Sequence, residues 1–175
     1  MKYFSLFSGI GGFEKAIETI IPDAKCVGYS EIDKYAIKTY EKNFGLGVKN
    51  YGDITTINVG ELPDFDLLLG GVPCQSWSIA GKRKGFEDIR GTMWFESFKI
   101  LKEKQPKYFI FENVKGLLSH DKGNSFERLC EHMCSLGYVI DFTVLNSKNL
   151  GVPQNRERVF IWGIRGDLLD KEQII

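Results

Sequence analysis

Short apolar runs alternate with segments of helical periodicity along most of this chain. The apolar runs lie at residues 3–7, 26–30, 65–69, 108–111, 138–145 and 159–164, with a weaker one at 48–51. Helical patterns occupy the segment that ends at residue 20 and residues 33–43, 92–103 and 125–136. Short apolar runs are typical of buried strands, and apolar positions three and four residues apart indicate helices. The pattern therefore predicts strands that alternate with helices.

This alternation predicts the fold class. Strands separated by helices form α/β folds with a doubly wound, mostly parallel sheet that helices cover on both faces. The runs at 138–145 and 159–164 have no helical segment between them, so we expect the last strand to be antiparallel. The length of 175 residues suits one domain spanning residues 1–175.

Polar and glycine residues stand where the predicted strands end. The first strand is followed by a glycine-rich turn at residues 7–13, the second by Glu31 and the third by Asp53. Cys74 follows the fourth strand, and Glu112 follows the fifth. Ligands of doubly wound sheets bind at the carboxyl ends of the strands. Five groups at one edge therefore predict a site.

The first three of these groups suit an adenosine ligand. Glycines let the backbone turn tightly and approach a ligand closely. Glu31 lies about twenty residues beyond the turn, where nucleotide sites place a ribose-binding carboxylate. Asp53 is placed either to cap a helix or to accept a hydrogen bond from an adenine amino group. The sequence lacks the phosphate-binding G-x-x-x-x-G-K-[ST] loop, so we expect S-adenosylmethionine rather than ATP.

The remaining two groups suit covalent chemistry. Cys74 offers a nucleophile, and Glu112 offers a proton donor or hydrogen-bonding acid. Taken singly, each of the five features also fits an ordinary structural role, because a lone cysteine is usually a small buried hydrophobe. It is their order along one edge that favours an active site.

The chain resembles the cytosine-5 DNA methyltransferases, especially the bacterial restriction-modification type. The matching stretches are residues 7–13, 31, 52–54, 73–78, 90–95, 111–114 and 151–159. Their order and spacing fit the family from residue 3 to about residue 165. The resemblance implies a Rossmann-like S-adenosylmethionine-dependent fold and methyl transfer to carbon 5 of cytosine in double-stranded DNA.

The resemblance also implies roles for individual residues. Catalytic roles fall to Cys74, Glu112, Arg156 and Arg158, with Arg158 holding the base or the active-site carboxylate. The implied cofactor contacts are Phe7, Gly9, Ile10, Gly11, Gly12, Glu31, Ile32, Asp53, Ile54, Pro73 and Met93. The implied DNA contacts are Gln75, Ser78, Lys82, Arg83, Lys84, Arg90 and Gln154. Ile32 stands where several relatives place an aromatic residue.

A basic stretch bounded by Gly81 and Gly85 follows the cysteine. A target carbon inside a duplex is out of reach, so the base must flip out of the helix. Glycine hinges and cations that meet phosphate suit a loop that closes over such a base. The alternative interpretation is an ordinary solvated basic turn.

Composition narrows the class of protein. The formal net charge is zero, so a nucleic-acid partner must be met by a local patch. Apolar runs are too short to cross a bilayer and the N-terminus does not resemble a signal peptide, so we expect a cytoplasmic protein. Cys130, His132 and Cys134 fall within a helical pattern whose apolar stripe includes Leu129 and Met133. We therefore expect packing there and no bound metal.

Several alternatives remain open at this stage. The chain stops where the resemblance predicts a target-recognition domain and a final helix, so a second chain that supplies both is one expected partner. A piece of a longer protein or a truncated reading frame would look the same. Transfer to tRNA cytosine and a non-catalytic cofactor-binding role are the alternative functions.

Overall fold

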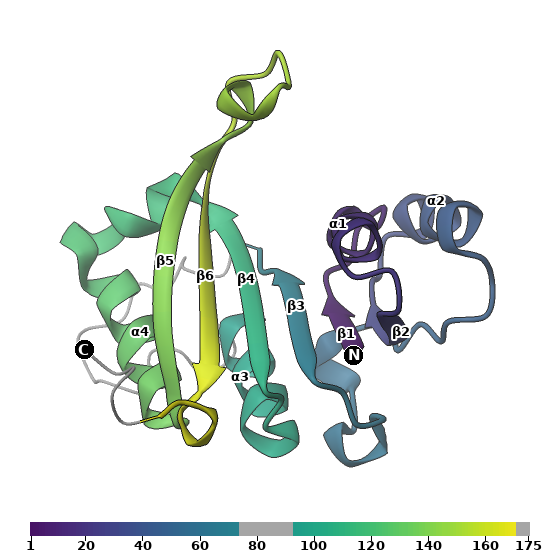
Figure 1. The fold of residues 1–175 in the computed structure, drawn as a ribbon, viewed down its shortest axis with the longest axis horizontal. Coiled ribbons are helices and arrows are strands. Elements are labelled where there is room, and N and C mark those ends of the chain that lie inside the picture. Colours follow the sequence, from purple (N-terminus) through teal and green to yellow (C-terminus); the bar gives the residue numbers. More distant parts are fainter. Residues whose placement is uncertain (74–92, 171–175) are drawn as a thin grey trace.

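The computed structural model describes residues 1–73 and 93–170. Its sheet has six strands in the order β2-β1-β3-β4-β6-β5 (Figure 1). The strands are β1 (Lys2–Leu6), β2 (Lys25–Ser30), β3 (Leu67–Gly71), β4 (Tyr108–Val114), β5 (Tyr138–Asn146) and β6 (Glu157–Arg165). β1 to β4 pair in parallel, whereas β6 is antiparallel to both β4 and β5. The predicted doubly wound sheet with an antiparallel last strand is confirmed.

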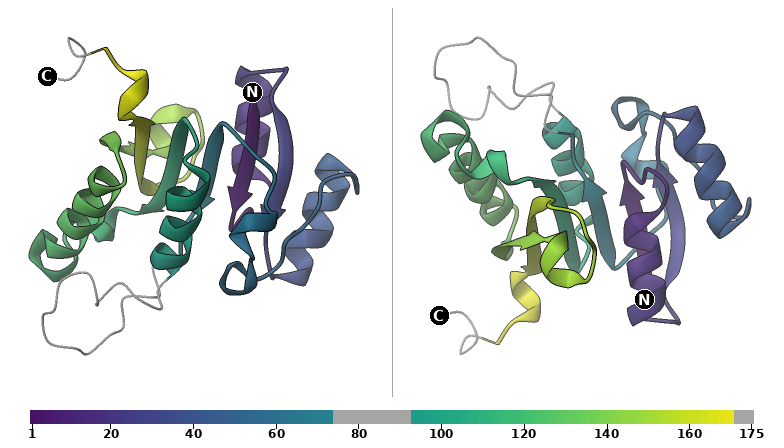
Figure 2. Two further views of the ribbon diagram at one scale, coloured as in Figure 1. Left: turned by 90° about the horizontal axis from the view of Figure 1, so that it is seen from below. Right: turned by 90° about the horizontal axis from the view of Figure 1, so that it is seen from above.

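Four α-helices accompany the sheet in the described residues. They are α1 (Gly12–Ile20), α2 (Lys34–Phe44), α3 (Met93–Lys104) and α4 (Asn124–Ser135). α1 covers one face, and α3 and α4 cover the other (Figure 2). α2 is capped by Asp33, whose carboxylate accepts hydrogen bonds from the amides of Tyr35 and Ala36. Short 3-10 helices lie at Ile54–Thr56, Val59–Glu61, Lys115–Leu118, His120–Gly123, Ser147–Leu150 and Gly166–Leu168.

The main core lies between the sheet and α3. Phe109 and Phe111 alternate along β4 and are fully buried. Trp94 of α3 meets Phe111 edge-on, with ring centroids 5.5 Å apart. Each large apolar side chain buried in this way contributes on the order of 2 kcal/mol. This packing fixes β4, and β4 carries Glu112.

One predicted strand is wrong. Residues 48–51 form a single bridge in which Asn50 pairs with Tyr29 of β2. The Tyr29 amide donates to the Lys49 carbonyl, and the Tyr51 amide donates to the Tyr29 carbonyl. The chain turns away at Gly52, where φ is +70°, so the pairing goes no further. Asp53 therefore follows a turn rather than a strand.

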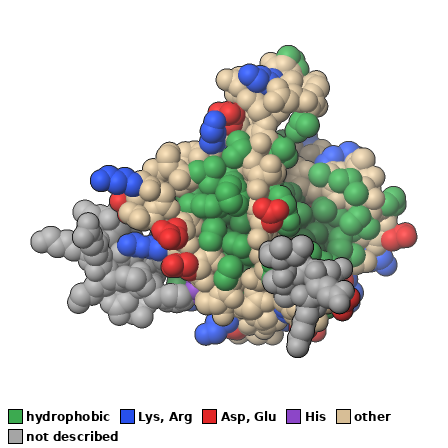
Figure 3. All heavy atoms as spheres, turned by 60° about the vertical axis from the view of Figure 1, so that its left-hand side comes forward, with side chains coloured by type: hydrophobic (Ala, Val, Ile, Leu, Met, Phe, Trp, Pro, Cys, Tyr) green, Lys and Arg blue, Asp and Glu red, His purple; other side chains and the backbone are tan. Residues whose placement is uncertain are grey.

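An apolar groove lies between α1 and the strands β4 and β6. Its cavity volume is ≈ 350 Å³, near the lower end for ligand pockets, and its lining includes Ile17, Tyr108, Trp162 and Ile164. α1 packs on Leu67 of β3. Among the described residues, no helix covers the part of this sheet face that β4 and β6 form. Figure 3 shows hydrophobic side chains exposed on this side of the molecule. Sheets of this class normally have both faces covered.

The cysteine-containing stripe on α4 packs as expected except at Cys134, which is exposed. Leu129 and Met133 are fully buried, and burial raises the pKa of the Cys130 thiol to about 11. The His132 ring meets the Phe98 ring edge-on with centroids 4.5 Å apart. Residues 1–73 and 93–170 contain no group of three side chains suited to a metal ion. Within the same residues, no helix has the length and apolar character needed to cross a membrane.

Candidate active site

The glycine-rich turn after β1 has an unusual backbone. Phe7, Gly9 and Gly11 all have positive φ angles, of 52°, 56° and 92°. A Cβ at Gly11 would lie 2.0 Å from a carbon of the Phe44 ring in α2, so only glycine fits there. Gly9 and Gly12 face open space instead. The turn thus leaves room for a ligand on one side while it packs on α2 on the other.

Glu31 holds this turn from the end of β2. One of its carboxylate oxygens accepts a hydrogen bond from the Gly9 amide at 2.8 Å. Its other oxygen accepts hydrogen bonds from the amides of Ile32 and Asp33, also at 2.8 Å. Two carboxylate oxygens offer about four acceptor positions, so one remains for a ribose hydroxyl. Glu31 can therefore shape the turn and still bind a ligand.

Asn50 connects the Glu31 segment with the Asp53 turn. Its side-chain oxygen accepts hydrogen bonds from the amides of Glu31 and Gly52, and its side-chain nitrogen donates to the Glu31 carbonyl. The hydroxyl of Ser30 donates to the Gly52 carbonyl at 2.7 Å. This bonding replaces the strand that the sequence predicted and keeps Asp53 beside the ends of β1 and β2.

Asp53 caps a 3-10 helix, which was one of its two predicted roles. One carboxylate oxygen accepts from the amide and the hydroxyl of Thr55, and these bonds lower the pKa of Asp53. The other carboxylate oxygen is available for an amino group. Ile54, the next residue, is buried in the core.

These residues fit S-adenosylmethionine. Open space at Gly9 and Gly12 lies beside the Glu31 carboxylate, which accepts from the Gly9 amide. Two large apolar side chains, next in sequence to Gly9 and to Glu31, are exposed: Ile10 is 59% exposed and Ile32 is 71% exposed. Exposed apolar side chains beside hydrogen-bonding carboxylates suit a nucleoside, which has an apolar ring face and polar edges. The carboxylates Glu31 and Asp53 would hold its hydroxyl and amino groups.

Glu112 and Arg158 form the second half of the site. Arg158 Nε lies 2.7 Å from Glu112 Oε1, and both side chains are about one-fifth exposed, at 21% and 23%. Glu112 lies within β4, which extends to Val114 and so beyond the strand that the sequence predicted. Glu112 pairs in register with Gly71 of β3. A Cβ added at Gly71 would lie 3.6 Å from Glu112 Oε2, so the carboxylate lies over the backbone of Gly71.

A buried amide ties β4 to the chain that leads to Cys74. Asn113 is 2% exposed, and its side-chain nitrogen donates to the Val72 carbonyl at 2.8 Å. Its side-chain oxygen accepts from the Val114 amide at 2.8 Å. Residues 72 and 73 are thus held beside the Glu112 strand.

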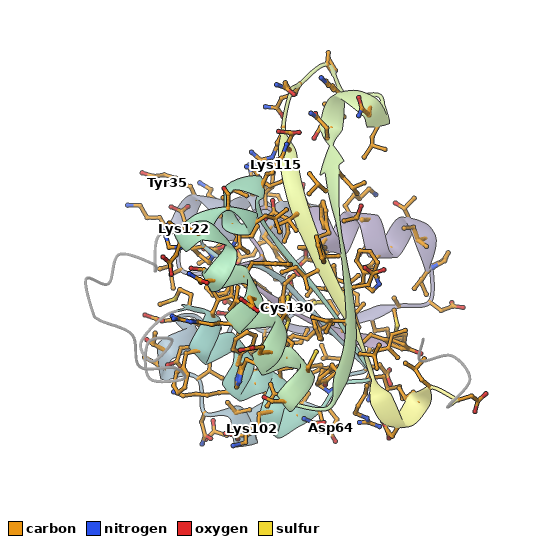
Figure 4. The ribbon with its side chains drawn as sticks, turned by 90° about the vertical axis from the view of Figure 1, so that its left-hand side faces the viewer. Tyr35, Asp64, Lys102, Lys115, Lys122 and Cys130 are labelled. Atoms are coloured by element: carbon orange, nitrogen blue, oxygen red, sulfur yellow. The ribbon has the colours of Figure 1, made fainter. Side chains whose placement is uncertain are left out.

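The connection between β5 and β6, residues 147–156, projects from the sheet as an arm (Figure 1). Asn146 closes its base by accepting a hydrogen bond from the Arg156 amide and donating to the Asn155 side chain. Lys115, which pairs with Glu157 at 3.0 Å, lies near this base (Figure 4). Arg156 and Gln154 are exposed on the arm.

The two predicted arginines are therefore arranged differently. Two residues at alternate positions, such as Arg156 and Arg158, face the same side only where both lie in a strand. β6 begins at Glu157, so Arg156 lies outside the strand, and strand alternation does not apply to it. Of the two, it is Arg158 that forms the ion pair with Glu112.

The remaining predicted residues lie outside the described part of the chain. They are Cys74, Gln75, Ser78, Lys82, Arg83, Lys84 and Arg90, together with the proposed closing loop. The described residues on either side are Pro73, which is exposed, and Met93, which begins α3 and packs on the core.

A model of the family described as C-5 cytosine-specific DNA methylase matches residues 1–174. The chain belongs to this family. An orphan methyltransferase of Bacillus phage rho11s is 53% identical over 174 residues, which make up 99% of this chain and 35% of that protein. The type II methyltransferase M.HhaI of Haemophilus parahaemolyticus is 46% identical, with 96% of this chain matching 50% of that protein. This family member thus spans about a third to a half of these curated relatives.

Solved structures support the fold of this cytosine-5 methylase chain. The crystal structure of Schizosaccharomyces pombe Dnmt2 methyltransferase matches 95% of the chain and 51% of its own length, with a TM-score of 0.77 and 22% identity. At that identity the match concerns the fold alone. S-adenosylmethionine is the methyl donor of the family, in agreement with the geometry of the turn and of Glu31.

Proposed function

We propose that this chain is the catalytic region of a DNA (cytosine-5-)-methyltransferase. It transfers a methyl group from S-adenosylmethionine to carbon 5 of a flipped cytosine, in a restriction-modification setting. The observation that carries the proposal is the Arg158–Glu112 pair on adjacent strands of a sheet that also carries the glycine-rich turn, in a chain of this family.

Cys74 is the proposed nucleophile. Carbon 5 of cytosine reacts poorly because it belongs to an aromatic ring. Addition of the Cys74 thiolate to carbon 6 breaks that conjugation and makes carbon 5 resemble an enamine. The cofactor supplies the electrophilic methyl group that carbon 5 then takes. Loss of the carbon 5 proton and departure of the thiolate from carbon 6 restore the aromatic ring.

Glu112 and Arg158 are proposed to handle the charge that develops on the ring. Thiolate addition places negative charge on the ring, and a carboxylic acid at ring nitrogen 3 offsets it by donating a proton or a hydrogen bond. The guanidinium of Arg158 fixes the orientation of the Glu112 carboxyl group. Asn113 supports the arrangement by holding Val72, two residues before Cys74, against β4.

Double-stranded DNA is the proposed substrate. The description of the family and the type II relatives favour DNA over the tRNA alternative. The proposed DNA contacts are Gln75, Ser78, Lys82, Arg83, Lys84, Arg90 and Gln154, with Arg156 near the target nucleotide. We also propose a cytoplasmic location, because the proposed substrate is DNA.

A polypeptide segment that supplies a recognition domain and a final helix is the proposed partner, either in the same protein or as a second chain. Two observations support it. The curated relatives are two to three times longer than the matched region, since this chain covers 35% to 50% of them. The apolar groove beside α1 is also of the kind that an amphipathic helix covers.

The experiment that tests the function compares the chain alone with a complemented chain. We define the complemented chain as this chain joined to the part of the Bacillus phage rho11s relative that lies outside the matched region. We expect the complemented chain to transfer labelled methyl groups to duplex DNA and the chain alone to transfer few. Absence of transfer by a folded, cofactor-binding complemented chain would contradict the proposal.

A further inference from the structure

A fully buried carboxyl group lies on the first turn of α1, two residues after Gly12. This is Glu14, whose side chain is 0% exposed. Neither of its carboxyl oxygens has a hydrogen-bond partner among the described residues, and the buried hydroxyl of Ser5 in β1 has none either. An ionised carboxylate without partners is very costly to bury, whereas a neutral acid costs much less. The position therefore favours the protonated form.

The groups around Glu14 offer no compensating charge. They come from all the elements packed on it and are Tyr3, Ser5, Cys26, Tyr29, Tyr40 and, on α1 itself, Glu18. None of them is positively charged. Burial has the largest influence on the Glu14 carboxyl group, and it raises the pKa of Glu14. Burial also raises the pKa of the Cys26 thiol.

These contacts connect the three elements that form the glycine-rich turn and its wall. β1 ends in the turn, α1 begins in it, and α2 follows Glu31. The Tyr40 ring of α2 stacks on Tyr29 of β2 with centroids 4.0 Å apart, and its hydroxyl lies 3.5 Å from the Cys26 sulfur. One helical turn later, Phe44 is the ring that packs against Gly11. A change at Glu14 therefore reaches both sides of the turn.

We propose that Glu14 is a positioning residue that acts as a neutral carboxylic acid. It holds α1 and α2 against β1, so that the glycine-rich turn keeps the shape that receives the cofactor. When Glu14 loses its proton, the carboxylate needs water or a cation, and α1 must move to admit one. Cofactor affinity then falls. This inference rests on the proposed function for its cofactor, but the protonation state of Glu14 can be measured without it.

The direction of the pH dependence follows from the raised pKa. Above the ordinary pKa of glutamate, the folded chain retains a proton that the unfolded chain has released. The stability that Glu14 contributes is fully present below the ordinary pKa of glutamate. It is lost as the pH rises through the raised pKa that Glu14 has in the folded chain. Glu14→Gln keeps the shape and neutrality of the acid, so it removes this loss.

The test uses the 175-residue chain and two single variants, Glu14→Gln and Glu18→Gln. Glu18 is an exposed carboxylate one turn along the same helix and is the matched control. Thermal unfolding is followed between about pH 5 and pH 9. We expect the melting temperature of wild type to fall relative to that of Glu14→Gln as the pH rises, and Glu18→Gln to follow wild type. Parallel profiles for wild type and Glu14→Gln would overturn the proposal.

A second measurement reports on the protonation state directly. In chain labelled with ¹³C-glutamate, the side-chain carboxyl signal that Glu14→Gln removes belongs to Glu14. We expect its chemical shift at neutral pH to be that of a protonated acid. The shift of an ionised carboxylate would overturn the proposal even if the variant failed to fold well.

The cofactor arm separates this proposal from the proposed function. S-adenosylmethionine affinity is measured by calorimetry across the same pH range. We expect wild-type affinity to fall at high pH and Glu14→Gln to stay within roughly twofold of its neutral value. Equal pH dependence in both proteins would contradict the positioning role. Absence of binding by wild type at every pH would contradict the proposed function, and the unfolding and carboxyl measurements would still decide whether Glu14 is neutral.

Discussion

Arg158 of β6 places its Nε 2.7 Å from Oε1 of Glu112 on the neighbouring strand β4. The antiparallel pairing produces this contact, because it sets Arg158 opposite Val114, two residues from Glu112 on the same side of the strand. Both side chains remain about one-fifth exposed, so a ligand can reach the pair. A charged pair oriented in this way can hold a carboxyl group in one position against a substrate.

Removing the guanidinium should impair methyl transfer far more than stability. We predict that Arg158→Ala lowers the rate in the complemented chain by roughly 10²- to 10⁴-fold, the usual contribution of a positioned acid. Arg158→Lys should fail as well, because an ammonium lacks the planar fork that orients a carboxylate. Single-turnover kinetics with labelled cofactor measures the effect.

The matched control for Arg158 is Lys107→Ala. It removes an ion pair between Lys107 and Asp66 that is 2.9 Å long and more exposed. Such pairs contribute about 0–1 kcal/mol, so we expect no change in transfer. Equal losses in both variants would mean that the Arg158 pair has no special role.

Asn113 should be needed for both stability and transfer. Asn113→Ala leaves the buried Val72 carbonyl without its donor, which costs about 1–3 kcal/mol. The loss frees the segment that leads to Cys74, so we predict slower transfer together with a lower melting temperature. Asn124→Ala, which removes an exposed side chain, is the control and should change neither. Normal transfer by Asn113→Ala would show that this bond does not position the nucleophile.

Gly11→Ala should weaken cofactor binding. The added Cβ would lie 2.0 Å from the Phe44 ring, and the φ of +92° is unfavourable for any residue with a side chain, by about 1–2 kcal/mol. α2 must shift to make room, which deforms the turn. We predict at least a roughly tenfold loss of S-adenosylmethionine affinity in calorimetry. Gly47→Ala faces open space and should bind like wild type.

Glu31→Gln tests whether the carboxylate shapes the turn. An amide has one acceptor oxygen, so it can keep either the Gly9 bond or the Ile32 and Asp33 bonds, but not both sets. We predict weaker cofactor binding and a lower melting temperature. Glu103→Gln changes an exposed glutamate of α3 and serves as the control. Unchanged binding by Glu31→Gln would contradict the role of Glu31.

Much of the fold could be predicted from periodicity alone. The apolar run at 65–69 and the helical pattern at 33–43 correspond closely to β3 and α2, because buried strands and capped helices leave local signals. The segment at 48–51 was the exception. Its apolar and aromatic residues resemble a short strand, but its backbone makes a single bridge to Tyr29, and the side chain of Asn50 makes the bonds to Glu31 and Gly52 beyond it.

The candidate site was predictable in its residue types and less so in its contacts. The order of Glu31, Asp53 and Glu112 along the chain identified the edge of the sheet. The roles of Asn113 and Phe44 could not be predicted, because each depends on a contact between residues 33 to 41 positions apart in sequence. The Glu-Asn dipeptide at 112–113 was visible in the sequence, but its amide partner at Val72 was not.

The central claim is that Cys74 attacks a cytosine that this site holds. Duplex DNA in which 5-fluorocytosine replaces the target base tests it directly, because fluorine at carbon 5 cannot leave as a proton does and the covalent adduct persists. With the complemented chain and S-adenosylmethionine, we predict an adduct that survives denaturation and is absent in Cys74→Ser. A persistent adduct in Cys74→Ser, or none in a wild-type protein that methylates ordinary DNA, would contradict the account.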